Sequence, residues 1–121
     1  MGTRKFPKKE ATSLTGSQNG IKYEMRIISR RKLSQFWEQR TDAEDALKAW
    51  FKEAEHAQWK TTSDIKARYR SADFLKDNRV VFNIKGNRYR LVVKIHYNMQ
   101  VVYIRFIGTH KEYEGINAEE V

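Results

Sequence analysis

The chain of 121 residues contains no cysteine, a single proline and no long apolar run. Without cysteine it can form no disulfide, thiolate metal site or cysteine nucleophile, which agrees with a reducing compartment. No apolar stretch approaches the roughly 20 residues needed to cross a bilayer, and no segment near the start resembles a signal peptide. The three histidines show no zinc-binding spacing. We therefore expect a soluble, cytoplasmic protein with no catalytic metal and no other cofactor.

Acidic residues are also scarce, and their distribution is uneven. Lysine and arginine total 24 against 15 aspartates and glutamates, which gives a formal net charge of +9. Between residues 60 and 111 there are twelve basic residues and three acids, whereas residues 37–56 hold six acids and three basic residues. An ordinary solvated surface mixes both signs, so the basic region indicates a polyanionic partner.

The first 24 residues differ in composition from the rest of the chain. They hold the only proline, three of the six glycines and little hydrophobic periodicity, so we expect them to be disordered. Met25 begins the first segment with the pattern of a strand, and we expect one folded domain over residues 25–121. We interpret residues 1–24 as a leader, from an upstream start or added for expression; a basic arm that grips a polyanion is the alternative.

Helical patterns follow the first strand. A short amphipathic helix should end near Arg40, and a second should begin with Thr41 as N-cap and Glu44 in a capping box. A third short helix is expected from Thr61, with Asp64 at its N3 position. The aromatic side chains of these helices lie on apolar stripes, which predicts that they pack in the core rather than stack on nucleic-acid bases. The two longer stripes consist of Leu33, Phe36 and Trp37, and of Ala43, Ala46, Leu47, Trp50, Phe51, Ala54 and Ala57.

Residues 79–113 alternate in the manner of three adjacent antiparallel strands. Gly86-Asn87 and Asn98-Met99 are the expected two-residue turns between them. Together with the strand near Met25, they predict an α+β fold: a four-stranded sheet with the helices on one face and the other face open. Two-residue turns pair Val80 with Val93, Phe82 with Leu91, Ile84 with Tyr89, and also Val93 with Ile104, Leu91 with Phe106 and Ile95 with Val102.

The same register sends a basic set of side chains to the opposite face of the sheet. Asn83 should lie across from Arg90, and Tyr103 across from Lys94. An ordinary solvated strand surface is the alternative interpretation of this face. The full set is Arg79, Asn83, Lys85, Arg88, Arg90, Lys94, His96, Tyr103 and Arg105.

Three segments of the chain resemble the HigB toxins of bacterial toxin–antitoxin modules, within the broader RelE-like group. They are Asn83–Leu91 (NIKGNRYRL), Tyr103–Phe106 (YIRF) and Thr109–Tyr113 (THKEY). The likeness spans roughly residues 25–118, although the helical region matches only in pattern and the leader has no counterpart. Glu114 stands where the family pattern has aspartate, and we assign it no role.

The resemblance implies a RelE-like fold and an mRNA interferase, an endoribonuclease that inhibits translation by cutting messenger RNA, often on the ribosome. It also implies a partner, a HigA-like antitoxin with a helix-turn-helix domain. Two alternatives remain open. One is a non-catalytic RNA-binding or ribosome-binding module, and the other is a protein-interaction module whose basic face docks the antitoxin. A neighbouring gene for a short helix-turn-helix protein would favour the toxin.

Metal-free RNA cleavage needs a base for the 2′-hydroxyl, an acid for the leaving oxygen and cations for the phosphorane. His110 is the candidate base or acid, since extending the strand ladder places it beside the Gly86-Asn87 turn. Tyr113 is the second proton-transfer candidate or a stacking surface, and Arg90 and Arg105 are expected to hold the phosphate. Structural roles are the alternatives: His110 as a cap of the strand end, Tyr113 as a packed residue of the tail, and Arg105 in an ion pair with an acid. The RNA-binding candidates are Asn83, Lys85, Arg88, Lys94, Tyr103 and Lys111.

Overall fold

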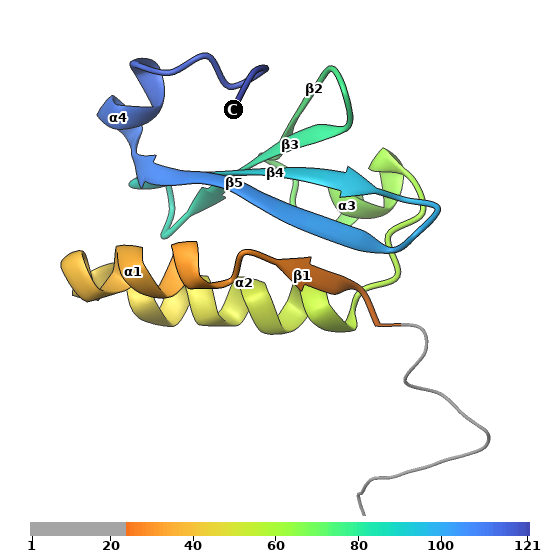
Figure 1. Cartoon of the computed structure of the whole chain (residues 1–121), viewed down its shortest axis with the longest axis horizontal. Coiled ribbons are helices and arrows are strands. Elements are labelled where there is room, and N and C mark those ends of the chain that lie inside the picture. Colours follow the sequence, from red (N-terminus) through yellow and green to blue (C-terminus); the bar gives the residue numbers. More distant parts are fainter. Residues whose placement is uncertain (1–23) are drawn as a thin grey trace, which may run out of the picture.

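The structure, a computed structural model, describes residues 24–121 of the chain (Figure 1). The strands are β1 (Arg26–Ile28), β2 (Asp73–Leu75), β3 (Arg79–Ile84), β4 (Tyr89–His96) and β5 (Val101–Thr109). The helices are α1 (Arg31–Gln39), the short 3-10 helix η2 (Thr41–Ala43), α2 (Glu44–His56), α3 (Thr62–Arg68) and α4 (His110–Glu114). The predicted α+β class is confirmed. The expected leader over residues 1–24 lies outside the described residues except for Glu24.

The described residues form one sheet of five strands rather than four, in the order β1-β5-β4-β3-β2. β1 lies parallel to β5, and the other neighbours are antiparallel. β2 is the strand that the sequence did not predict. It has only three residues and pairs with Val80 and its neighbours in β3 after a turn in which Asp77 and Asn78 both have positive φ. Three residues are too few to show an alternating pattern.

The register of the β3–β4 hairpin is as predicted, because Ile84 lies opposite Tyr89 and Asn83 opposite Arg90. The β4–β5 register is as predicted only as far as Ile104, which lies opposite Val93. Beyond it, Ile107 rather than Phe106 lies opposite Leu91, so this part of the prediction was wrong. The register shifts between Val92 and Val93, where a β-bulge inserts Arg105 as an extra residue in β5.

The core lies between the sheet and helices α1 and α2, which run side by side along one face (Figure 1). Leu33 of α1, Leu47 of α2 and Phe82 of β3 are fully buried there. Burial of a phenylalanine of this size stabilises the fold by about 2–3 kcal/mol. Trp50 lies edge-on to Phe82, with ring centroids 5.4 Å apart. The other stripe aromatics pack against the same cluster, so their assignment to the core is confirmed.

The helix starts differ in how well the sequence predicted them. The capping box of Thr61 and Asp64 is present, and the Asp64 carboxylate accepts the backbone N–H groups of Lys60 and Thr61 at 2.8 and 3.1 Å. Thr41 and Glu44 form no such box, because Thr41 begins η2 and Ala43 occupies the N-cap of α2. No helix in the described part of the chain is long and apolar enough to span a bilayer.

The face of the sheet opposite the helices is not fully open, which corrects the prediction. α4 and the C-terminal segment lie on this side (Figure 1). Val81 and Val92, which are paired on β3 and β4, are buried although they lie outside the main core cluster. Arg79 is only 8% exposed and donates from Nε and Nη2 to the carbonyl of Val121 at 3.1 and 2.8 Å. The two valines interrupt the row of basic side chains on this face. Because removing apolar side chains from water is favourable, they favour a covered face over an open one.

Candidate active site

The junction of β5 and α4 fixes His110 at one end of the sheet. Thr109 caps α4: its hydroxyl accepts the N–H of Glu112 at 3.0 Å, and the Glu112 carboxylate accepts the N–H of Thr109 at 2.7 Å. The backbone N–H of His110 donates to the carbonyl of Arg88 at 3.2 Å. His110 therefore lies beside the β3–β4 turn, where the extended ladder placed it.

Arg90 lies against the imidazole of His110. It sits on β4, opposite Gly108, and its Nη2 is 2.7 Å from His110 Nδ1. Its Nη1 donates to the carbonyl of Asn87 at 3.1 Å. Arginine has only donors, so Nδ1 must be the acceptor and carries no proton in this arrangement. The contact therefore selects the imidazole tautomer whose hydrogen is on Nε2.

Glu114 contacts the other side of the His110 ring. Its Oε2 is 3.0 Å from His110 Nε2. The two residues are four positions apart on α4, which brings side chains onto the same face of a helix. A carboxylate accepts the Nε2 hydrogen that the Arg90 contact leaves on the ring. Arg90, His110 and Glu114, hereafter the His110 series, are thus joined by two hydrogen bonds.

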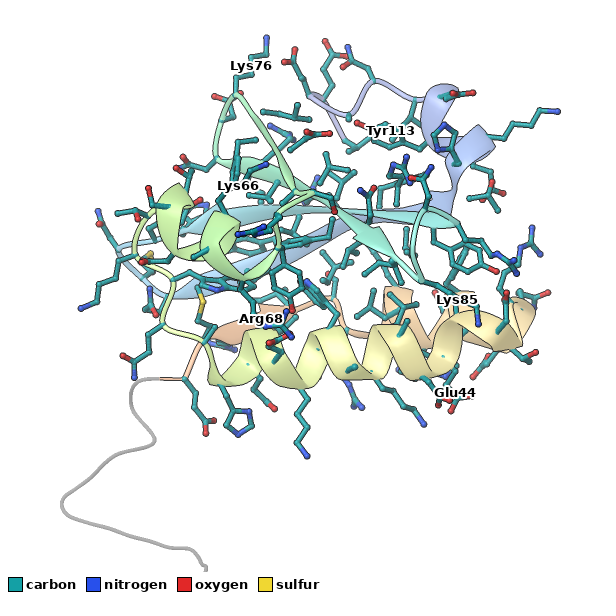
Figure 2. The ribbon with its side chains drawn as sticks, turned by 180° about the vertical axis from the view of Figure 1, so that it is seen from behind. Glu44, Lys66, Arg68, Lys76, Lys85 and Tyr113 are labelled. Carbon is teal, nitrogen blue, oxygen red and sulfur yellow. The ribbon has the colours of Figure 1, made fainter. Side chains whose placement is uncertain are left out.

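Tyr113 lies next to this series, on the same side of the sheet as α4 and the C-terminal segment (Figure 2). The Arg90 guanidinium carbon is 6.0 Å from the centre of its ring, at the outer limit for a cation–π contact. The rings of Tyr113 and Phe106 are 6.5 Å apart. A Cβ atom at Gly108 would come within 2.6 Å of Phe106 Cζ and 2.9 Å of Glu112 Oε1. Glycine there leaves space for Phe106 and for the α4 cap.

Glu114 is the residue of this site that the sequence reasoning missed. Its signal was the i, i+4 spacing from His110, which has meaning only if the segment is helical. α4 has five residues, too few for a visible hydrophobic period, and we expected His110 simply to follow the last strand. The Ser/Thr-x-x-Glu pattern of Thr109 and Glu112 was the sequence feature that could have revealed the helix.

Arg105, the fourth catalytic candidate, is not part of the His110 series. It is the extra residue of the β5 bulge, it is exposed, and its side chain makes no hydrogen bond or ion pair with another described residue. It instead borders a groove together with Lys32 and Phe36 of α1. The bulge accounts for this position, because it changes the direction of β5 relative to the predicted register.

Arg88 is engaged by Asp42 rather than free to meet RNA. Its Nη1 is 2.7 Å from Asp42 Oδ2, and the Tyr89 hydroxyl donates to the other oxygen of the same carboxylate. The Tyr89 hydrogen bond, followed by that of Arg88, lowers the pKa of Asp42 below its ordinary value. The Asp42 carboxylate in turn raises the pKa of Tyr89. The Asp42 carboxylate thus offsets the charge of Arg88, and its hydrogen bonds link η2 to the β3–β4 turn.

The remaining RNA-binding candidates are spread along the sheet. Lys85 is exposed at the turn (Figure 2), with a positive φ of 54°. The side chain of Asn83 makes a long contact of 3.5 Å with the carbonyl of Ser71. Lys94 lies opposite Tyr103, whose ring packs edge-on to His96 at 5.2 Å. Lys111 is exposed on α4. The structure brings Arg90, His110 and Tyr113 together and leaves these residues around them or farther along the sheet.

A family model matches residues 43–116 of the chain, more than half of its length. It describes a RelE-like toxic component of a toxin–antitoxin system. The chain therefore belongs to the HigB toxin family, as the resemblance of its strand motifs implied. The matched range includes all three members of the His110 series and Tyr113.

Curated relatives match a shorter part of the chain. It is 39% identical over 62 residues to the mRNA interferase toxin HigB of Escherichia coli (strain K12). The same identity and length apply to the mRNA interferase HigB of Escherichia coli O157:H7 and that of Shigella flexneri. In each case the alignment covers 50% of this chain and 60% of the relative. The chain thus spans less than two thirds of the length of these relatives.

Proposed function

We propose that this protein is an endoribonuclease that cuts messenger RNA, an mRNA interferase, and acts as the toxin of a toxin–antitoxin pair. The observation that carries the proposal is the His110 series: an imidazole held between a guanidinium and a carboxylate. Membership in the HigB toxin family and the names of the relatives support it. The net charge of +9 favours a polyanionic substrate.

The chemistry begins with the 2′-hydroxyl of the RNA itself. His110 Nδ1 carries the lone pair that can take its proton, and Arg90 occupies this lone pair in the free protein. When a phosphate enters, the guanidinium moves its hydrogen bond from Nδ1 to a phosphate oxygen, which exposes the base. Glu114 then faces an imidazolium, and its negative charge stabilises this cation as a carboxylate does in a catalytic triad.

The phosphorus–oxygen bond is made and broken in the following step. The deprotonated 2′-oxygen attacks the adjacent phosphorus, and the negative charge on the phosphorane faces the Arg90 fork. The bond to the 5′-oxygen breaks, and this oxygen takes a proton from the Tyr113 hydroxyl or from the imidazolium. The products are a 2′,3′-cyclic phosphate and a 5′-hydroxyl. His110 and Tyr113 thus supply proton transfer, and Arg90 supplies charge and geometry.

The partners belong to the same proposal. The substrate is messenger RNA, with the ribosome as the place of cleavage, and the inhibitor is a HigA-like antitoxin carrying a helix-turn-helix domain. The protein acts in the cytoplasm, where its substrate is translated. Family membership supports an antitoxin in general, and the ribosome and the antitoxin type follow from the resemblance of the strand motifs.

Induced expression without an antitoxin tests the proposal directly. We expect growth arrest, and primer extension should map new 5′ ends within coding regions of transcripts. His110→Gln, which keeps a polar side chain at this position, should express equally and leave transcripts whole. Arrested translation with intact transcripts would contradict the proposal and favour a non-catalytic ribosome-binding module.

A further inference from the structure

A groove runs along the outer edge of β5, where no strand among residues 24–121 covers it. β1 pairs only with Val101–Tyr103, so α1 rather than a strand lies beside the rest of β5. Figure 1 shows the C-terminal end of β5 between α1 and α4. Two adjoining hollows of about 570 and 380 Å³ lie there. Both are lined by the same four residues, Phe36, Gln39, Phe106 and Ile107. We call the two hollows together the β5–α1 groove.

The lining of the β5–α1 groove combines three kinds of side chain. Phe36 and Phe106 offer half-buried rings, and Gln35 and Gln39 offer amides on α1. Four cations complete it: Lys32, Arg40, Arg105 and Lys111. These side chains suit the binding of single-stranded RNA. Its bases stack on aromatic rings, its base edges form hydrogen bonds with amides, and its phosphates attract cations. The volumes lie within the range of ligand sites.

The cations of this groove differ from three other arginines in how they are engaged. Arg79, Arg88 and Arg90 are held by the Val121 carbonyl, by Asp42 and by the His110 series, respectively. None of the four groove cations makes an ion pair with another residue among positions 24–121. The one acid of the lining, Glu112, is already bonded to the backbone of Thr109. The lining therefore carries four cations and one acid, a net positive surface that suits a polyanion.

We propose that the β5–α1 groove binds the single-stranded RNA that flanks the scissile phosphate. This inference rests on the proposed function, since it extends the same substrate beyond the His110 series. Lys111 follows His110 directly in the chain, so the groove begins beside the proposed chemistry. A protein segment could also fill a partly apolar groove, but four cations against one acid, with no ion pair to any of them among residues 24–121, favour a nucleic acid.

Binding to uncleavable RNA separates this inference from catalysis. The probe is a single-stranded oligonucleotide with one 2′-deoxy residue at a mapped cleavage site, and the affinity of the full chain is measured over a range of salt concentrations. Lys32→Gln/Arg40→Gln removes two groove charges, one on α1 and one at its C-cap. Lys52→Gln/Lys60→Gln is the matched control, because it removes two exposed charges that line neither hollow of the groove.

We expect the groove variant to bind about tenfold more weakly at ~0.15 M salt, with a salt slope lower by about 1.4, as two lost phosphate contacts predict. The control should keep the original slope. A 4-thiouridine next to the cleavage site should crosslink to peptides that contain Phe36 or Phe106. A groove variant with the slope of the wild type overturns the inference, as does a control with an equal loss.

The same measurements separate the remaining outcomes. If the unaltered chain cuts RNA but the groove variant binds it normally, the inference fails alone. If the unaltered chain neither binds nor cuts RNA, either free or on translating ribosomes, the proposed function fails with it. If the groove variant keeps its RNA affinity but loses the antitoxin in a pull-down from co-expressing cells, the groove is a protein-docking site and the inference is wrong.

Discussion

The two regions at the C-terminal end of β5 use positive charge in opposite ways. In the His110 series, one guanidinium is held at 2.7 Å from an imidazole whose other nitrogen faces a carboxylate. In the β5–α1 groove, four cations line two adjoining hollows, and none of them has an ion-pair partner among the described residues. A side chain held in one geometry suits a transition state, whereas an unpaired, exposed cation suits a flexible backbone.

This difference implies a division of labour that kinetics can separate. Side chains of the His110 series should affect the rate of the chemical step, because their geometry matters only where charge develops. Side chains of the groove should affect affinity and its salt dependence. A variant of one region that reproduces the behaviour of the other would contradict the division.

The largest effect is expected at His110. His110→Ala or His110→Gln should lower the single-turnover cleavage rate by about 10² to 10⁴, because general acid–base catalysis acts in the transition state. The affinity for uncleavable RNA should remain nearly unchanged. His56→Gln serves as the matched control, since His56 is exposed at the end of α2. Normal cleavage by His110→Ala would remove His110 from the mechanism and make Tyr113 the next candidate.

Arg90 should affect both quantities, because it holds the phosphate as well as the imidazole. Arg90→Ala should slow cleavage by roughly 10² to 10³ and also weaken RNA binding. Arg90→Lys should recover much of the binding but less of the rate, since the point charge is kept and the planar fork is lost. Measuring rate and affinity for both variants, with the exposed Arg70→Ala as control, decides it. Equal rates for the two Arg90 variants would show that the fork is not used.

A smaller effect is expected at Glu114, because its side chain is 65% exposed and water can partly replace its carboxylate. Glu114→Gln should lower kcat by about tenfold with little change in KM, since the carboxylate acts on the imidazolium rather than on RNA. Glu114→Asp should retain part of the activity through the same charge on a shorter side chain. The exposed Glu120→Gln is the control. A change in KM alone would assign Glu114 to binding instead.

Asp42 provides a test through stability rather than rate. Its folded-state pKa is lowered by the hydrogen bonds of Tyr89 and Arg88, so its contribution is present above its ordinary pKa and is lost as the pH falls through the lowered value. Asp42→Asn should therefore unfold at a lower urea concentration near neutrality. The difference from the unaltered chain should disappear in strong acid. A difference that persists there would show that the amide disturbs packing rather than charge.

The sequence was sufficient to predict the features that depend on local pattern. Alternation and turn residues fixed the pairing of Ile84 with Tyr89, and helical spacing placed Trp50 in the core. The bulge at Arg105 had no comparable signal in the sequence. Apolar and basic residues make up both the expected and the observed strand, so one inserted residue leaves its composition unchanged. β2 was too short to show a period.

Contacts between distant segments account for the other differences. The sequence predicted a helix start at Thr41 and gave no role to Asp42, which bonds to Arg88 and Tyr89, 46 and 47 positions away in the sequence. Arg79 was expected on an open face and is held by Val121. The location of His110 was predictable from the ladder, whereas its contact with Glu114 depended on a five-residue helix. The roles of these residues in cleavage remain predictions.

The nature of the cleaved ends tests the central claim most directly. The unaltered chain should be incubated with messenger RNA, free in the presence of a metal chelator and separately on translating ribosomes, and the product ends identified by mass spectrometry. We predict a 2′,3′-cyclic phosphate and a 5′-hydroxyl, and no cleavage when the nucleotide before the scissile bond lacks its 2′-hydroxyl. Cleavage that requires a divalent metal and leaves a 5′-phosphate would contradict the proposed use of His110, Arg90 and the RNA's own 2′-hydroxyl.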